Sequence, residues 1–387
     1  MNATWALLQL LGSVALLLWG VRMVRTGITR AFGALLRHTI AISARSRFLA
    51  FGAGLAVTGL LQSSTATALI LASLAERGLI ALPVALAMAL GADVGTTIAA
   101  QVLTFEVKAL WSAFLIAGFV LFSVSERDRL RNGGRILMGI GMTLLALLHT
   151  GATASMIEHS PAFAAVLRAV AGEPIIAFVI AAAVTWLAHS SLAIVLFVVT
   201  LAAANAISLT LAMTFVLGAN VGGALAAFMA LTGASAAGRR VALGNLFMRL
   251  AGAVAMLMLL APAQALLVQI EPSPGRLVVN FHTAFNIAVA VVFLGLLGPV
   301  AKLMQRLLPE APKSEEPLRP RHLDPHALDN PAEALACALR ETLALGDRVA
   351  DMLDRALVAL ETSDSRLVRE IEKSDDAIDA IYEAIKL

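Results

Sequence analysis

Long apolar runs dominate this sequence and limit the folds that it can adopt. An α-helix needs about 20 consecutive apolar residues to cross a lipid bilayer. Only 14% of the 387 residues are charged, whereas a soluble domain carries about 25%. The chain is therefore predicted to be an all-α, polytopic membrane protein. The candidate spans lie near residues 5–21, 79–104, 109–124, 136–149, 209–231, 241–261 and 277–298.

Two further apolar stretches, 48–75 and 175–204, contain a pair of serines near their middle. Each stretch is too long for one straight span, and each half is too short to cross alone. The first is interrupted at Gln62-Ser63-Ser64-Thr65 and the second at His189-Ser190-Ser191. A hydroxyl in hydrocarbon must be paired, hydrated or bound to a ligand, because leaving it unsatisfied is costly. Both stretches are predicted to form re-entrant helical hairpins, which enter and leave by the same membrane face.

A second polar motif follows each serine pair at the same distance. It reads GADVGTT from Gly91 to Thr97 and GANVGG from Gly218 to Gly223. Glycines flank polar residues in both copies, which predicts a local break in each helix. Matching polar interruptions in two halves of a chain indicate the binding site of a secondary transporter.

Arginines in the segments between apolar runs predict the orientation of the spans. They are Arg22, Arg25, Arg30, Arg37, Arg45 and Arg47, then Arg127, Arg129, Arg131 and Arg135, then Arg239 and Arg240. The positive-inside rule places all three groups in the cytoplasm. The first hairpin then enters from the cytoplasm, the second enters from outside, and the C-terminus is cytoplasmic. This predicts a transmembrane domain, 1–300, with inverted repeats at about 5–124 and 136–261 and an extra helix at 277–298.

The composition changes after the last apolar run. Residues 301–331 are charged and rich in proline, which predicts a linker. Asn330-Pro331 is a good helix start, and apolar residues at helical spacing follow it. A small helical tail of two amphipathic helices is expected over residues 332–387, with a turn near Ser363 and apolar stripes facing each other or the membrane domain.

The polar residues of the interruptions suit two kinds of ligand. Hydroxyl and amide oxygens are suited to Na⁺ where a helix is unwound, and the N-terminal ends of half-helices attract anions. Small residues also allow membrane helices to pack closely without binding anything. The paired Ser-Ser tips favour the functional interpretation, whereas isolated serines and threonines in the spans favour packing.

Several ionisable residues within or beside the apolar runs leave more than one role open. Asp93 is an acid within an apolar run, so it is a candidate cation ligand, proton carrier or structural cap. Arg249 could face the anion, pair with Asp93 or extend to the cytoplasmic surface. His189 and His282 could titrate near neutral pH, although a buried histidine with satisfied hydrogen bonds is commoner.

These motifs carry a resemblance to a known family. The two serine tips, the Gly91–Thr97 and Gly218–Gly222 motifs, and His282-Thr283-Ala284-Phe285-Asn286 resemble the Na⁺/phosphate cotransporters of type II and their bacterial relatives. The resemblance covers about residues 10–300, and the tail resembles the start of a PhoU-like domain. It implies that phosphate moves together with Na⁺, that the tip serines bind phosphate, and that nearby Thr and Asn residues lie near the cations.

The predicted site follows from the motifs and the resemblance together. The phosphate-binding candidates are Ser63, Ser64, Ser190, Ser191, His189 and Arg249, and the sodium-binding candidates are Gln62, Thr65, Asp93, Thr96, Thr97 and Asn220. The second repeat departs from the family pattern, with His189 in place of Gln and with Gly222-Gly223 where the first repeat offers Thr96-Thr97. It is therefore poorer in cation ligands, and Na⁺ binding is predicted to concentrate on the first repeat.

The resulting prediction is a secondary transporter of the bacterial inner membrane that moves inorganic phosphate with Na⁺ by alternating access. An exporter of phosphate or of another small oxyanion is the first alternative, and a membrane-bound phosphate sensor is the second. The apolar region offers no nucleophile and base pair, which argues against an enzyme. The net charge of +3 does not indicate nucleic-acid binding. No cofactor other than Na⁺ is expected, and homo-oligomerisation stays open.

Overall fold

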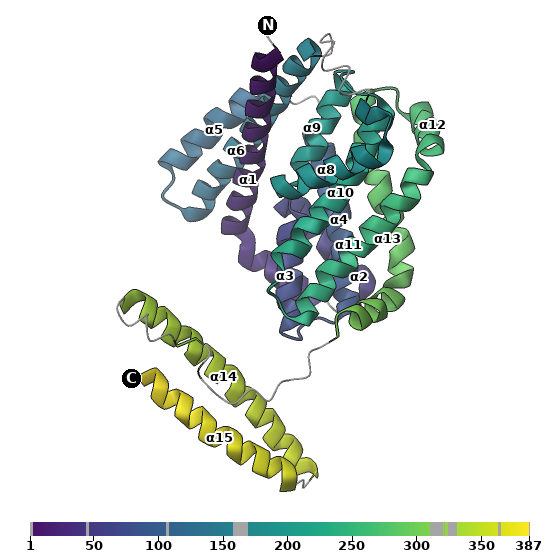
Figure 1. The fold of residues 1–387 in the computed structure, drawn as a ribbon. Coiled ribbons are helices and arrows are strands. Elements are labelled where there is room, and N and C mark those ends of the chain that lie inside the picture. Colours follow the sequence, from purple (N-terminus) through teal and green to yellow (C-terminus); the bar gives the residue numbers. More distant parts are fainter. Residues whose placement is uncertain are drawn as a thin grey trace. The chain divides into compact units, whose positions relative to one another are not determined.

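The described residues of the protein are almost all helical (Figure 1). The computed structural model describes residues 3–43, 46–105, 108–157, 169–309, 320, 322–323, 331–362 and 365–386, and within these ranges it contains no strand. The α-helices are α1 (Ala3–Ile42), α2 (Arg47–Leu61), α3 (Ser64–Glu76), α4 (Leu82–Leu103), α5 (Trp111–Val124), α6 (Asp128–Ile157), α8 (Pro174–Ala188), α9 (Ser191–Ala203), α10 (Leu209–Ala230), α11 (Ala236–Met258), α12 (Leu260–Ile270), α13 (Pro274–Leu307), α14 (Pro331–Thr362) and α15 (Ser365–Lys386). A short 3₁₀ turn, Lys108–Leu110, precedes α5. The prediction of an all-α membrane protein is confirmed.

Six of the described helices are long and apolar enough to cross a membrane. Their spanning segments are Trp5–Gly33, Leu82–Leu103, Asp128–Ala154, Leu209–Ala230, Ala236–Met258 and Pro274–Leu307. Each predicted span corresponds to a helix. No apolar run predicted α12 as a separate helix, and α5 is shorter than a full crossing.

The first helix is much longer than its apolar run. It continues from Ala3 to Ile42. The arginines expected in a loop after the first span therefore belong to this helix; they are Arg22, Arg25, Arg30 and Arg37. The reason is that this segment contains no proline and only isolated glycines, so nothing in it ends the helix. Arginines therefore lie on the faces of α1, where they can point into the protein.

The first serine pair lies at a sharp turn between α2 and α3. Gln62 ends α2 with φ 54° and ψ 29°, a left-handed conformation that reverses the chain. Ser63 then adopts an extended backbone and caps α3, its Oγ accepting a hydrogen bond from the Ala66 N–H. Serine is among the residues that helix N-caps prefer, which explains why α3 begins here.

The second serine pair repeats this geometry between α8 and α9. His189 ends α8 with φ 52° and ψ 28°, and the Ser190 Oγ accepts a hydrogen bond from the Ala193 N–H. The two hairpins lie in opposite halves of the helical body, with α2 and α3 below and α8 and α9 above in Figure 1. We call residues 62–65 the first tip and residues 189–192 the second tip.

The glycine-rich motifs do not break their helices. Both α4 and α10 are continuous through them, so the predicted interruptions at Gly91–Thr97 and Gly218–Gly223 are wrong. The glycines permit close helix packing: a Cβ built on Gly91 would lie 1.9 Å from the Phe51 carbonyl oxygen of α2, and one on Gly222 would lie 2.2 Å from the Ala182 oxygen of α8. Each hairpin is thus held against the long helix that follows it.

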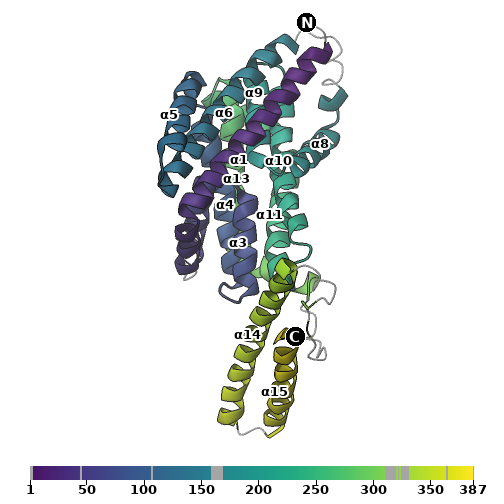
Figure 2. The same ribbon diagram turned by 90° about the vertical axis from the view of Figure 1, so that its left-hand side faces the viewer.

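The chain divides into two compact units, Met1–Glu310 and Ala311–Leu387. In the second unit α14 and α15 pack side by side (Figure 2), which agrees with the predicted pair of tail helices. Their apolar residues do not all face each other: Ile381 is buried, but Leu335, Leu343 and Leu357 of α14 are more than half exposed. The predicted linker, 301–331, begins inside α13, and most of the remainder lies outside the described residues, as does Asn330.

Candidate anion pocket between the two hairpin tips

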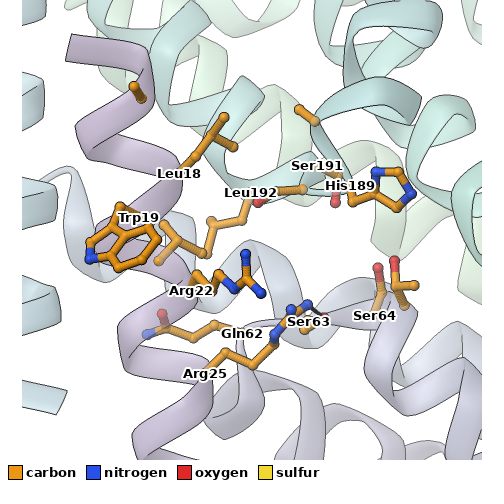
Figure 3. Close-up of a pocket in the computed structure, with 15 residues that line it drawn as sticks. Leu18, Trp19, Arg22, Arg25, Gln62, Ser63, Ser64, His189, Ser191 and Leu192 are labelled. Atoms are coloured by element: carbon orange, nitrogen blue, oxygen red, sulfur yellow. Dashed lines mark hydrogen bonds between the residues drawn. The ribbon is translucent and has the colours of Figure 1, made fainter. Parts of the chain in front are cut away.

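The two tips meet at one pocket, although they lie far apart in the sequence (Figure 3). The cavity has a volume of about 380 Å³. Its walls come from α1 and from both tips. The lining residues are Ala15, Leu18, Trp19, Val21, Arg22 and Arg25 of α1, Gln62, Ser63, Ser64 and Thr65 of the first tip, and Ala188, His189, Ser190, Ser191 and Leu192 at the second. The predicted meeting of Ser63, Ser64, Ser190 and Ser191 is confirmed.

The two serine-capped helices direct positive potential into this pocket. The N-terminus of α3 begins at Ser64 and that of α9 at Ser191, and both residues line the cavity. The first turn of a helix carries N–H groups without intrahelical partners and about half a unit of positive charge. Figure 3 shows Ser63 and Ser64 on one side of the cavity and Ser191 on the other. Two helix N-termini that face one space are suited to an anion.

Arg22 and Arg25 of α1 add two full positive charges to the same cavity. Neither was among the predicted site residues. They lie one helical turn apart, and their guanidinium groups extend toward the tips in Figure 3. The Nη1 of Arg25 donates a hydrogen bond to the Ser63 Oγ at 3.2 Å. Their spacing of three residues, which puts them on one helix face, was the available signal. Guanidinium groups bind oxyanions through paired N–H donors.

The side chains of Gln62 and His189 differ although their backbones match. The Oε1 of Gln62 is buried and has no hydrogen-bond partner among the described residues, which leaves an oxygen able to accept from a ligand or hold a cation. The His189 ring is exposed, and its Nδ1 lies 3.0 Å from the Leu187 carbonyl oxygen. This leaves the other ring nitrogen of His189 directed away from the backbone.

The predicted sodium ligands fall into two groups. Gln62 and Thr65 line the pocket. Asp93 and Asn220 do not line it and belong to a separate buried cluster between helices. Thr96 and Thr97 are also buried outside the pocket, and their hydroxyls donate to the Asp93 and Val94 carbonyl oxygens at 2.7 and 2.8 Å. A joint role for all six in binding Na⁺ stays a prediction.

The buried cluster is centred on an ion pair between α4 and α11. The Arg249 Nε donates to the Asp93 Oδ2 at 2.6 Å, and its Nη2 donates to the Asp93 Oδ1. The Nη1 of Arg249 donates to the Asn220 carbonyl oxygen of α10 at 2.6 Å. Arg249 is 1% exposed and Asp93 is 2% exposed. Of the three alternatives for Arg249, the structure shows the pair with Asp93, and the guanidinium does not line the anion pocket as the predicted phosphate role requires.

Asparagine side chains extend the cluster to α13. The Asn286 Nδ2 donates to the Asn220 Oδ1 at 3.0 Å and to the His282 carbonyl oxygen at 2.8 Å. The Asn220 Nδ2 in turn donates to the Val216 carbonyl oxygen at 2.8 Å. His282 and Asn286 are each 2% exposed. Asn220 and Asn286 thus share one amide–amide hydrogen bond, and each amide also donates to a backbone carbonyl oxygen.

The cluster and the pocket are separated by little more than Gly223. A Cβ built on this residue would lie 3.2 Å from the Ser191 Oγ and 3.6 Å from the Arg249 Nη1. With the helices aligned on their tips, Gly223 corresponds to Thr96, and Gly222 corresponds to Gly95. The pairing of Gly222-Gly223 with Thr96-Thr97 in the sequence analysis was therefore one residue out of register.

The chain is similar in sequence to known proteins over almost its whole length. The family model described as Na⁺/Pi-cotransporter matches residues 16–151 and again residues 155–300, and a PhoU domain model matches residues 342–387. The chain is 37% identical over 381 residues to the "Putative inorganic phosphate export protein YjbB" of Escherichia coli, which covers 98% of this chain and 70% of that protein. It is 26% identical over 306 residues to the "Uncharacterized protein YqeW" of Bacillus subtilis, which covers 78% of this chain and 99% of that protein. No solved structure matches.

The fold and the site together define a polytopic membrane protein with a polar pocket between two hairpin tips. The family match covers both halves of the helical body separately. The chain belongs to the Na⁺/Pi-cotransporter family and carries a PhoU domain sequence at its C-terminal end.

Proposed function

We propose that the pocket binds inorganic phosphate and that the protein carries it across the membrane. The observation that carries this proposal is the convergence of two helix N-termini and two arginines on one cavity. Phosphate is a small oxyanion with several acceptor oxygens. Arg22, Arg25 and the serine hydroxyls supply donors around it, and family membership supports the same substrate.

The arrangement of the hairpins suits alternating access. Each tip forms one side of the pocket, and the two hairpins extend from it into opposite halves of the body. Moving one hairpin away from the other would open the pocket toward one membrane face, and moving the other would open the opposite face. We propose that both hairpins are re-entrant and that the pocket lies near the bilayer midplane.

We also propose Na⁺ as the coupling ion, held on the first tip. The unpartnered Oε1 of Gln62 and the hydroxyl of Thr65 are neutral oxygens beside the anion pocket. The second tip has His189 and Leu192 at the corresponding positions, and these offer no side-chain oxygen. A cation at the first tip would partly neutralise the phosphate and so favour binding of both together.

Export is the second candidate for the direction of transport. It is favoured by the name of the Escherichia coli relative, which matches almost the whole of this chain. The pocket itself contains nothing that fixes a direction, because a carrier runs down whichever combined gradient it is given.

Flux measurements on the purified chain in proteoliposomes test these proposals. Radiolabelled phosphate should cross the membrane, and unlabelled phosphate and arsenate should compete better than sulfate. Loading the vesicles with phosphate and imposing Na⁺ gradients of either sign tests whether phosphate moves with Na⁺. The phosphate content of cells that produce the protein separates uptake from export. Tight binding without flux would contradict the transporter and favour a phosphate sensor. Flux of sulfate with exclusion of phosphate would identify another oxyanion as the substrate.

A further inference from the structure

The ion pair between Asp93 and Arg249 has the oxygen donors of a cation site, and a side chain fills it. Two carboxylate oxygens of Asp93 and the backbone oxygen of Asn220 converge on one guanidinium group. Carboxylate and carbonyl oxygens are the ligands that hard cations such as Na⁺ prefer. Three different helices, α4, α10 and α11, contribute to this position.

We propose that the Arg249 guanidinium serves as an attached cation at the position where a Na⁺ ion would otherwise bind between Asp93 and Asn220. The position then takes no cation from solution, and the chain binds one Na⁺ fewer than these oxygens could hold. The inference rests on the proposed transport function for its biological meaning, but its test needs neither phosphate nor flux. It replaces the sequence prediction that Asp93 and Asn220 are Na⁺ ligands.

Burial of the Asp93 carboxylate favours a positive charge beside it, whether that charge belongs to Na⁺ or to the Arg249 guanidinium. A carboxylate removed from water needs a counter-charge, and bidentate pairing with a guanidinium provides it. Asp93 and Arg249 are almost fully buried, so removing the arginine charge leaves a buried carboxylate without a counter-charge, with Asn245 as a remaining hydrogen-bond donor. Such a carboxylate takes up either a small cation or a proton.

The position is also close enough to the pocket to matter for the anion. The Arg249 Nη1 and the Ser191 Oγ of the second tip both lie within 4 Å of a Cβ built on Gly223. The attached guanidinium stays at this position beside the pocket wall, whereas a Na⁺ ion would have to bind and leave.

The test compares thermal unfolding of the full-length protein in sodium chloride and in choline chloride at equal concentration. Arg249→Gln removes the charge and keeps much of the volume. We expect Na⁺ to raise its melting temperature by about 2 °C or more beyond the increment seen in the wild type. Arg249→Lys keeps an attached cation and should show only the wild-type increment. The double variant Asp93→Asn with Arg249→Gln removes the carboxylate and should likewise show no extra increment.

Arg276→Gln is the control for loss of an arginine. The Arg276 Nη1 donates to the Thr104 Oγ1 at 3.4 Å, and its guanidinium lies over the Phe105 ring, neither of which is a carboxylate that could take up Na⁺. An equal Na⁺ increment in Arg249→Gln and the wild type would overturn the proposal, as would an equal increment in the single and double variants. Recovery of folded Arg249→Gln only in the presence of Na⁺ would support it. Failure of Arg249→Gln to fold even in Na⁺, while the double variant folds, would also overturn it.

A negative outcome here is distinguishable from failure of the proposed function. Absence of phosphate flux in the wild type would contradict transport and leave the Na⁺ increments unaffected. Normal flux with no gain of Na⁺ binding in Arg249→Gln would contradict only the attached cation.

Discussion

Gln62 and His189 have nearly the same left-handed backbone, with φ of 54° and 52° and ψ of 29° and 28°. Residues other than glycine rarely adopt positive φ, because Cβ crowds the carbonyl group. Both residues stand between the two helices of a hairpin, immediately before a serine cap. The turn that places each serine at the pocket therefore holds one residue in a strained backbone conformation.

That strain predicts that two substitutions of His189 differ in their effect on stability. His189→Gly should leave the melting temperature near that of the wild type, since glycine adopts positive φ freely and the ring is exposed. His189→Val should destabilise by about 1–3 kcal/mol, because a β-branched residue is strained in this region. Thermal unfolding of purified protein compares the two. Equal stability of both variants would show that the turn carries no strain.

Arg25 should be needed for phosphate binding. Its guanidinium lines the pocket and donates to Ser63. Loss of a charge-assisted hydrogen bond to the anion predicts a rise in the apparent Kd for phosphate of about ten-fold or more in Arg25→Gln. Arg30→Gln, on the same helix but outside the pocket lining, is the control and should bind normally. Similar weakening in both variants would mean that only the general positive charge of α1 matters.

Gly91 should tolerate no side chain. A Cβ there would lie 1.9 Å from the Phe51 carbonyl oxygen, whereas a Cβ on Gly52 of the facing helix would meet nothing within 4 Å. Gly91→Ala should therefore separate α2 from α4 and lower the melting temperature. Gly52→Ala should be neutral or slightly stabilising, by up to about 1 kcal/mol. Should Gly91→Ala unfold at the wild-type temperature, the close approach of these helices would be refuted.

Two threonines at corresponding places in the hairpins should respond differently to valine. The Thr58 and Thr67 hydroxyl oxygens lie 2.6 Å apart in a hydrogen bond between α2 and α3. The Thr185 hydroxyl of α8 is buried without a hydrogen-bond partner among the described residues. Thr58→Val should cost about 1 kcal/mol, and Thr185→Val should be neutral or stabilising. Denaturant or thermal titrations measure both, and a larger loss for Thr185→Val would contradict the assignment.

Transport should survive loss of the tail. All residues that line the pocket belong to the first unit, Met1–Glu310. A variant lacking residues 311–387 should therefore retain most of its phosphate flux in proteoliposomes. Size-exclusion chromatography establishes that the truncated protein is folded. Complete loss of flux in a folded truncation would assign the tail a direct part in transport.

Much of the fold could be predicted from local sequence. The serine tips were recognisable because a polar pair inside an apolar stretch and a good N-cap residue coincide at Ser63 and Ser190. Arg22 and Arg25 were missed as site residues, because an arginine beyond an apolar run has the same local pattern whether the helix stops or continues. The Asp93–Arg249 pair was one of three alternatives, since it depends on how α4 packs against α11, which no local pattern determines. The glycine motifs were misread as breaks for the same reason.

The boundary between the two halves of the chain passes through the pocket itself, with one tip on each side. A molecule held there is bonded to both halves at once and acts as a removable cross-link between them. Any rigid-body displacement of one hairpin relative to the other must change the dimensions of the cavity. Ligand occupancy should therefore restrict the movement of one hairpin relative to the other. The loaded protein should be stiffer than the empty one along this displacement and unchanged along others.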